Sequence, residues 1–190
     1  MIEWREQKIE LPLQPIETLC ASLHSDDARR VETCCAEGLV IIVDGAVRVQ
    51  VEAHLAASDD EQGGLLLGAV FFRSGSRAPA VVHVRESVAA TDFSSSGVSL
   101  RMEPRVWTHA REALREGELI VGWYHSHPGL SAFFSDTDRR TQRAFFPHPF
   151  SVGWVRDPIH AHECWFVGAD SVEVPPARLL TIPPDVARAP

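Results

Sequence analysis

Two histidines separated by a single residue, His125 and His127, are the side chains of this sequence whose types and spacing most directly suggest chemistry. Side chains two residues apart on a β-strand point to the same face. Both imidazoles can therefore converge on one point at the end of the apolar run 119–124. Asp138 adds a carboxylate from a following polar segment. Two nitrogen ligands and one oxygen ligand, with a fourth position left for water, are typical of a catalytic zinc ion, so the sequence predicts one zinc at these three residues.

Each half of this pattern also has a simpler interpretation. A His-x-His pair on a half-buried strand is more often two hydrogen-bonded core histidines than a metal site. Ser135 and Asp138 equally suit the start of a helix over 139–145, with the serine as N-cap and an acid in the first turn. Pro128 and Gly129 break the strand directly after the second histidine and turn the chain towards the serine. That turn favours the metal site, because it brings the two halves together.

The spacing of these residues resembles the JAMM signature of the MPN (Mov34/JAB) metalloprotease family. His-Ser-His-Pro stands at 125–128, and Ser135 and Asp138 follow at the spacing of that signature. The upstream sequence EQGGLLLG at 61–68 matches the family's second element, Glu-x-x-Gly-x-Leu-x-Gly, position by position. The resemblance covers about residues 40–170 and adds Glu61 to the candidate site. Motifs of this kind are hypotheses until their structural context is seen.

The residues themselves indicate the chemistry. A zinc ion held by the two histidines and Asp138 would lower the pKa of a bound water to about 7. Glu61 would act as general base and pass the proton to the leaving amine. Without its match to the motif, Glu61 would be interpreted as a solvated residue of the acidic run 59–61. Ser135 is not needed as a nucleophile, and its hydroxyl suits a hydrogen bond to the developing oxyanion. The predicted reaction class is amide hydrolysis.

The resemblance also implies the architecture. It implies an α/β protein with the MPN (JAB1/MPN, cytidine-deaminase-like) fold, a mixed, mainly antiparallel curved sheet flanked by helices. We expect an N-terminal extension at 1–37, a catalytic domain at 38–172 and a Pro-rich C-terminal tail at 173–190. The prolines of the tail favour an extended or docking segment outside the core.

Apolar periodicity predicts the elements within these segments. In the extension we expect a strand over 4–13 and helices over 15–23 and 26–37. The apolar stripe Ile16, Leu19, Cys20 and Leu23 needs a burial partner, which is either its own domain or another protein. Asp44-Gly45 predicts a tight turn between strands 39–43 and 46–51. The remaining elements are strands at 64–72, 79–89, 119–125, 150–156 and 163–167 and helices at 52–58, 103–115 and 139–145.

Composition and charge narrow the class of protein. The chain has 190 residues, of which 45% are hydrophobic, which suffices for one substantial core. No apolar run is long enough for a membrane helix, and the first residues lack the features of a secretory signal. Four cysteines without a C-x-x-C pair favour reduced thiols. We therefore expect a cytoplasmic protein. Its net charge of -8 argues against nucleic acid as a partner and is compatible with a basic peptide tail as substrate.

A second group of possible ligands, His160, His162 and Cys164, alternates along a predicted strand. Its simpler interpretation is two loop or strand histidines and a small buried thiol, since no fourth ligand stands nearby in the sequence. The resemblance agrees, because the short run between Asp138 and Phe150 leaves no room for the insertion that carries a second zinc in eukaryotic relatives. We expect one zinc and a small prokaryotic form of the family. Trp123, Trp154 and Trp165 lie in apolar runs and are expected in the core.

The resemblance implies a substrate class. Active JAMM proteins cleave peptide or isopeptide bonds after the C-terminal glycine of ubiquitin or of ubiquitin-like and sulfur-carrier proteins. Three functions remain open. The first is deconjugation or precursor processing of a ubiquitin-like protein. Its partners would then include conjugation-pathway proteins of a bacterial antiphage system, and this pathway assignment is an analogy at the level of the family. The second is maturation of a sulfur carrier for biosynthesis. The third is a non-catalytic MPN scaffold, against which the full set of site residues counts.

Overall fold

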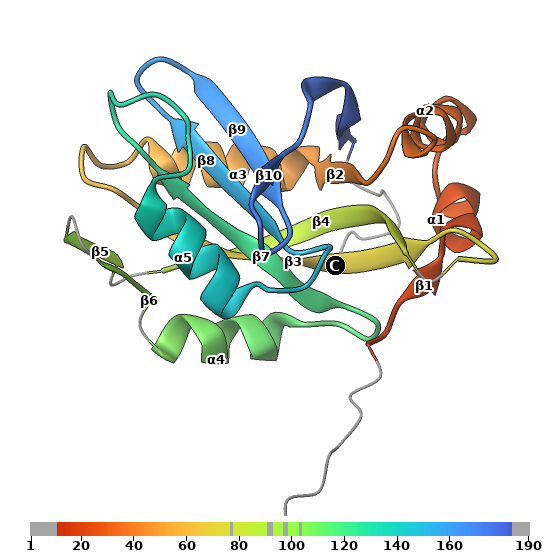
Figure 1. Cartoon of the computed structure of the whole chain (residues 1–190), viewed down its shortest axis with the longest axis horizontal. Coiled ribbons are helices and arrows are strands. Elements are labelled where there is room, and N and C mark those ends of the chain that lie inside the picture. The colour runs from red at the N-terminus through yellow and green to blue at the C-terminus, as the bar shows by residue number, and fades with distance from the viewer. Residues whose placement is uncertain (1–10, 77, 91–92, 97–98, 103, 184–190) are drawn as a thin grey trace, which may run out of the picture.

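A computed structural model describes residues 11–76, 78–90, 93–96, 99–102 and 104–183 of this chain. A mixed β-sheet in the order β10-β9-β8-β7-β3-β4-β2-β11 forms its framework, and β1 pairs with the far end of β3 (Figure 1). The strands of this sheet are β1 (Gln14–Pro15), β2 (Val40–Asp44), β3 (Gly63–Phe72), β4 (Pro79–Ala89), β7 (Leu119–Ser126), β8 (Val152–Asp157), β9 (His162–Val167), β10 (Val172–Glu173) and β11 (Leu179–Ile182). A separate hairpin consists of β5 (Phe93–Ser96) and β6 (Ser99–Met102).

Helices cover both faces of the sheet (Figure 1). They are α1 (Ile16–Ser22), α2 (Ser25–Cys35), α3 (Gly45–Leu55), α4 (Pro104–Ala113), α5 (Asp136–Phe145) and the short 3-10 helix η1 (Pro176–Arg178). Helix α3 packs on one face through a cluster that includes Val47 and Val82. Helix α4 packs on the opposite face, where Val106 joins a cluster with Leu65 and Trp123. Helices α1 and α2 pack at the end of the sheet that carries β1 (Figure 1).

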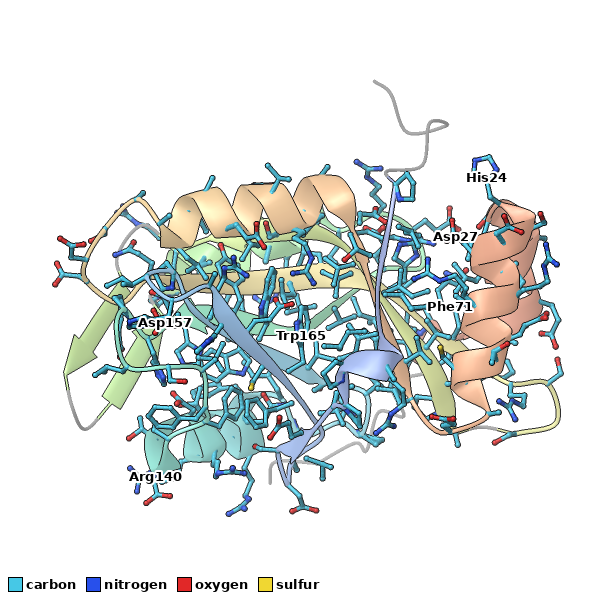
Figure 2. All side chains as sticks on the ribbon, turned by 90° about the horizontal axis from the view of Figure 1, so that it is seen from above. His24, Asp27, Phe71, Arg140, Asp157 and Trp165 are labelled. Carbon is cyan, nitrogen blue, oxygen red and sulfur yellow. The ribbon has the colours of Figure 1, made fainter. Side chains whose placement is uncertain are left out.

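The pairing of the strands confirms the predicted fold class. The three longest ladders, β3 with β4, β3 with β7 and β8 with β9, are antiparallel. Parallel pairs join β7 to β8, β4 to β2 and β2 to β11. The sheet is therefore mixed and mainly antiparallel, as the resemblance implied. The three tryptophans Trp123, Trp154 and Trp165 are fully buried in the core, as expected, and Figure 2 labels Trp165 at the centre of the molecule.

The predicted hairpin around Asp44-Gly45 is wrong. The first strand exists as β2, but the second, 46–51, is the start of α3, which also absorbs the helix expected at 52–58. The sequence of α3 alternates apolar and polar residues, which imitates a strand. Its buried residues Val47, Val51 and Leu55 are spaced by four, so as a helix it presents one apolar face to the sheet. Burial of that face outweighs the strand preference of the valines.

The other predicted elements of the domain are found with shifts of a few residues at their ends. Strand β4 has the predicted bounds, β3 and β7 are one residue longer than expected at one end, and α5 begins at Asp136 rather than 139. The helix expected at 103–115 is α4. The strand expected at 4–13 lies mostly outside the described residues. The hairpin of β5 and β6 was not predicted, because its short Ser-rich run has no clear apolar alternation.

The apolar stripe of the extension is buried on its own chain. Ile16 and Leu19 are buried in a cluster with Phe71 of β3, and Cys20 and Leu23 pack against its margin. Figure 2 labels Phe71 beside these helices. Strand β1 also pairs with β3 next to Phe71. The described residues thus favour packing within the chain, while the division into segments at 37 and 172 stays a prediction.

The Pro-rich tail does not lie outside the core over its described part. Strand β11 pairs in parallel with β2, and Leu180 and Ile182 are buried. Pro175 and Pro176 occupy the turn before β11, where Pro176 begins η1, and Pro183 follows the strand. Proline composition therefore misled the sequence interpretation, because the alternating apolar positions of a short edge strand follow directly after the turn.

Two glycines of β3 allow its neighbours to approach closely. A Cβ atom at Gly68 would collide with the backbone carbonyl of His83 on β4. A Cβ atom at Gly64 would lie 2.7 Å from the ring of Tyr124 on β7 and collide with a carbonyl of β4. Only glycine fits at these positions. The glycine frame of the 61–68 element thus holds β3 tightly beside β7, which carries His125 and is followed directly by His127.

Candidate metal centre

The structure brings the three predicted metal ligands together in the interior. His125, His127 and Asp138 are buried, and their ligand atoms all lie within 4.8 Å of one another. The two Nε2 atoms are 3.1 Å apart. The Nε2 of His125 lies 3.4 Å from Oδ1 of Asp138, and the Nε2 of His127 lies 3.6 Å from its Oδ2. Three lone-pair donors therefore face one point.

These separations fit a zinc ion. In a tetrahedral site with bonds of about 2.0–2.1 Å, neighbouring ligand atoms lie about 3.3–3.4 Å apart. The 3.1 Å between the two nitrogen atoms and the 3.4 Å between His125 and Oδ1 of Asp138 lie close to that value, and the three ligand atoms together lie within 4.8 Å of one another. In the part of the chain that the structure describes, this is the one group of His, Cys, Asp or Glu residues so arranged. A mixed set of two imidazoles and one carboxylate suits zinc with one open position.

Aromatic rings hold the imidazoles at the end of β7. The ring of Trp123 is stacked on that of His125, with centroids 4.5 Å apart and planes 6° from parallel. The ring of Phe133 lies 5.0 Å from that of His127. Among the described residues, neither Nδ1 atom has a hydrogen-bond partner. Stacking on Trp123, rather than a hydrogen bond from Nδ1, therefore orients the ring of His125, and Phe133 adds a contact to the ring of His127.

The third ligand comes from the first turn of α5. Ser135 is the N-cap of this helix, and its side chain accepts a bond from the backbone N–H of Asp138. In return, Oδ2 of Asp138 accepts bonds of 2.7 Å from the backbone N–H and from the hydroxyl of Ser135. This reciprocal capping box fixes the carboxylate. The N-cap interpretation is confirmed, and it is compatible with a metal site, because the cap orients the candidate ligand.

Glu61 reaches the same site from the entrance of β3. The backbone of Gln62 exchanges two bonds with Ser126, one to the serine hydroxyl and one from the serine N–H, each of 2.9 Å. This pairing ties the entrance of β3 to the end of β7. The Oε1 atom of Glu61 lies 3.9 Å from Nε2 of His127, and its side chain is 25% exposed. Glu61 is outside the ligand group and borders on solvent, as a base that acts on water should.

Electrostatics favour the ligand forms of two of these residues. Burial, together with the neighbouring His125, lowers the pKa of His127 and favours its neutral, lone-pair-bearing form. Burial acts to raise the pKa of Asp138, but the hydrogen bonds from His125 and Ser135 outweigh it, so that this pKa lies below its ordinary value. Both side chains are therefore ready to bind a cation at neutral pH.

The second group of possible ligands does not form a metal site in the structure. His160 instead bonds to Asp157 through its Nδ1, at 2.7 Å from Oδ2. The ring centroids of His160 and His162 are 6.2 Å apart, and the thiol of Cys164 donates to Glu173. Among the described residues, His160 lies in the turn before β9, His162 begins β9, and the thiol of Cys164 is half-buried rather than buried.

Gln142 is a residue of the site that sequence reasoning missed. It lies one helical turn after Asp138 and is fully buried. Its Oε1 accepts a 2.7 Å bond from the indole N–H of Trp123, the ring stacked on His125. Its amide nitrogen donates to the backbone carbonyls of Ser151 and Gly168. Gln142 thus joins the helix that carries one ligand to the ring that orients another.

Replacing Gln142 with leucine should destabilise the fold and weaken metal binding. It leaves the indole N–H of Trp123 without a partner in the interior and removes one of the two hydrogen bonds to each of the carbonyls of Ser151 and Gly168. We expect a loss of about 1–3 kcal/mol in the free energy of unfolding. Zinc affinity should fall by about 10–100-fold, because the orienting contact is lost. Denaturant titration and a competing chelator measure the two effects.

Arg143→Leu is the matched control, since this neighbour is exposed on the same helix. It should change stability by less than about 0.5 kcal/mol. Equal effects of the two substitutions would show that Gln142 has no special role.

Comparison with known proteins agrees with this geometry. Residues 44–167 match the family described as prokaryotic homologs of the JAB domain. The 26S proteasome regulatory subunit rpn11 of Schizosaccharomyces pombe is 37% identical over 79 residues, which are 39% of this chain and 26% of that protein. The histone deubiquitinase MYSM1 of Branchiostoma floridae is 37% identical over 98 residues, 51% of this chain and 11% of that protein. The chain therefore spans about a quarter or less of these relatives.

A solved structure supports the fold. The solution structure of protein DSY2949 from Desulfitobacterium hafniense aligns with a TM-score of 0.60 at 22% identity, covering 78% of this chain and 97% of that chain. At this identity the likeness shows the fold alone.

The fold and the buried His-His-Asp group define a JAB/MPN domain with a candidate zinc centre. The chain belongs to the family of prokaryotic JAB-domain homologs, which its match over 44–167 shows. This is a family with deubiquitinase relatives, and it supports a peptidase or isopeptidase class. Among the described residues, no helix has the length and apolar character needed to cross a membrane.

Proposed function

We propose that this protein is a zinc-dependent peptidase or isopeptidase that cleaves after the C-terminal glycine of a ubiquitin-like protein. The observation that carries the proposal is the convergence of three buried ligand atoms with the carboxylate of Glu61, 3.9 Å from His127. A non-catalytic scaffold would have no use for a base beside a ligand set with an open position. The deubiquitinase relatives support the substrate class.

In this proposal each residue has one task. His125, His127 and Asp138 would hold the zinc ion, which supplies Lewis acidity and an activated water at neutral pH. Glu61 takes a proton from the attacking water and delivers it to the leaving amine, which its border position between His127 and solvent allows. The water oxygen first bonds to the carbonyl carbon, whose oxygen becomes an oxyanion; the C–N bond then breaks as the carbonyl re-forms and the leaving amine takes the proton from Glu61.

Ser135 would serve first as a holder of Asp138. Its hydroxyl carries one proton, and in the structure that proton is donated to Oδ2 of Asp138. The backbone N–H of Ser135 donates to the same oxygen, so the ligand stays fixed if the hydroxyl turns away. A hydrogen bond from the hydroxyl to the oxyanion therefore requires rotation of this one side chain when substrate arrives.

The charge beside the site supports a basic tail as the bound segment. Asp59 and Asp60 are exposed directly before Glu61, and the chain as a whole has a net charge of -8. Such a field favours the approach of a positively charged peptide. We propose that the partner is the C-terminal tail of a ubiquitin-like or sulfur-carrier protein. We further propose that the protein acts in the cytoplasm, together with conjugation-pathway proteins of a bacterial antiphage system.

Cleavage of defined tails tests the proposal. Ubiquitin-like and sulfur-carrier proteins extended beyond their terminal glycine by a fluorescent amine are incubated with the zinc-loaded protein, and mass spectrometry locates the cut. We expect cleavage after the glycine, loss of activity with chelator and recovery with zinc. The same substrates with valine in place of that glycine are the control. Absence of cleavage in the whole panel would contradict the proposal, and cleavage of sulfur-carrier tails alone would favour the biosynthetic function.

A further inference from the structure

The carboxylate of Asp157, at the end of β8, gathers five hydrogen bonds although its side chain is completely buried. Its Oδ1 accepts from the backbone N–H groups of Gly129, Ile159 and His160, at 3.0, 2.9 and 3.3 Å. Its Oδ2 accepts from the backbone N–H of Ser131 at 2.9 Å and from Nδ1 of His160 at 2.7 Å. One side chain thus joins two loops, 128–134 and 158–161.

The first of these loops connects the metal ligands. It begins after His127 and ends at Ser135, the cap that orients Asp138. Its backbone takes the left-handed conformation at Gly129, with φ 73°, and at Ser131, with φ 72°. A left-handed residue other than glycine is held only where its surroundings impose it. Both of these residues donate their N–H to Asp157, which provides that constraint.

The two loops carry apolar side chains to the surface beside the site. Leu130 is 64% exposed, Phe133 47% and Ile159 62%. The ring of Phe133 contacts that of His127, so this surface is continuous with the ligand group. Large apolar side chains that remain exposed together indicate a contact surface. Here they border the place where the cleaved bond of a substrate would have to lie.

We propose that Asp157 is a positioning residue of the active site, which shapes the 128–134 loop so that Leu130 and Phe133 contact the polypeptide substrate beside the zinc ligands. This inference rests on the proposed function for the identity of the substrate. It concerns substrate binding and not metal binding. Asp157 touches neither metal nor substrate and acts through the loop. Figure 2 labels its position.

The ionisation of Asp157 agrees with this role. Burial acts to raise its pKa, but the bond from His160 and the backbone N–H groups of Gly129 and Ser131 outweigh burial, and the pKa lies well below its ordinary value. The carboxylate is therefore a charged acceptor at neutral pH. Bonds from N–H groups to a charged acceptor are stronger than those to a neutral one.

The metal ligands also have supports outside this loop. His125 lies in β7, His127 follows β7 directly and donates its N–H to the carbonyl of Arg156, and Asp138 is carried by α5 with its Ser135 cap. None of the five bonds of Asp157 goes to a ligand side chain. A change at Asp157 should therefore alter the loop and leave the zinc in place.

Asp157→Asn tests the inference, since its amide NH₂ would face N–H donors where an oxygen now accepts. His160→Ala removes one of the five donors and should have a weaker effect in the same direction. Asp170→Asn changes an exposed carboxylate in the turn between β9 and β10 and is the matched control. Zinc content, the thermal midpoint, cleavage by chymotrypsin after Leu130 or Phe133, and the kinetic constants with a tail substrate are measured for each.

For Asp157→Asn we expect one zinc per chain, rapid chymotryptic cleavage within the loop, a KM raised about tenfold and a kcat changed less than about threefold. His160→Ala should lie between this variant and the wild type. A loop that stays resistant, a loss of zinc, or a fall in kcat at constant KM would each overturn the inference. If the wild type cleaves no tail, the proposed function fails, and protease resistance and zinc content still decide whether Asp157 holds the loop.

Discussion

Replacing Glu61 with glutamine should lower kcat for tail cleavage by about 10²–10⁴-fold, the usual contribution of a general base. Zinc content should remain at one per chain, because Glu61 lies outside the ligand group and its Oε1 is 3.9 Å from the nearest ligand nitrogen. The amide keeps the size of the side chain but cannot accept the proton. Steady-state kinetics and metal analysis of the same preparation measure both quantities.

Asp60→Asn is the control for this experiment. It removes an equal charge from the exposed neighbouring position and should leave kcat nearly unchanged. If Glu61→Gln cleaved at the wild-type rate, another residue would be the base. If it lost its zinc, Glu61 would belong to the ligand set, contrary to the geometry.

Replacing both His125 and His127 with alanine should abolish zinc binding and, with it, all detectable cleavage. Only the carboxylate of Asp138 would remain, and one oxygen ligand cannot hold zinc at the concentrations of an ordinary purification. The expected result is less than about a tenth of an equivalent of zinc per chain. Elemental analysis after gel filtration gives the value, and circular dichroism checks that the fold is kept.

His162→Ala is the matched histidine control, because His162 is exposed and outside the ligand group. It should keep one zinc and full activity. Stoichiometric zinc in the double variant would show that the metal is bound elsewhere, and the proposed function would lose its foundation.

The candidate site could be predicted from sequence because most of its geometry is local. His125 and His127 are two residues apart at the end of β7, and Ser135 and Asp138 belong to the first turn of α5 and its cap. For these pairs spacing alone determines which way the side chains point. Glu61 is different, since it is far from the histidines along the chain. Only the resemblance of 61–68 to a known motif assigned Glu61 to the candidate site.

The residues that were not predicted form hydrogen bonds to partners far away in the sequence. Gln142 bonds to Trp123 and Gly168, and Asp157 bonds to Gly129 and Ser131. No periodicity marks such pairs, because a buried polar side chain gives the same signal as a solvated one until its partners are known. A glutamine on an amphipathic helix would ordinarily be assigned to solvent.

The errors in secondary structure have a related cause. The alternation in 46–51 is a local strand signal, and only the sheet that α3 covers makes a helix the better solution. The prolines around η1 and β11 predicted an extended tail, whereas the parallel partner β2 lies at the other end of the sequence. Long-range pairing of this kind is not visible in composition.

The pairing of β11 with β2 also has a consequence for the order of folding. Strand β2 is synthesised before the other long strands of the sheet, but its outer partner β11 is the last of the strands described, so the outer edge of β2 stays unpaired until β11 has been synthesised. Contacts between such distant segments slow folding and leave apolar surface exposed meanwhile. The run Val40–Asp44, which is entirely buried in the folded protein, is therefore open to aggregation through its unpaired edge during that interval.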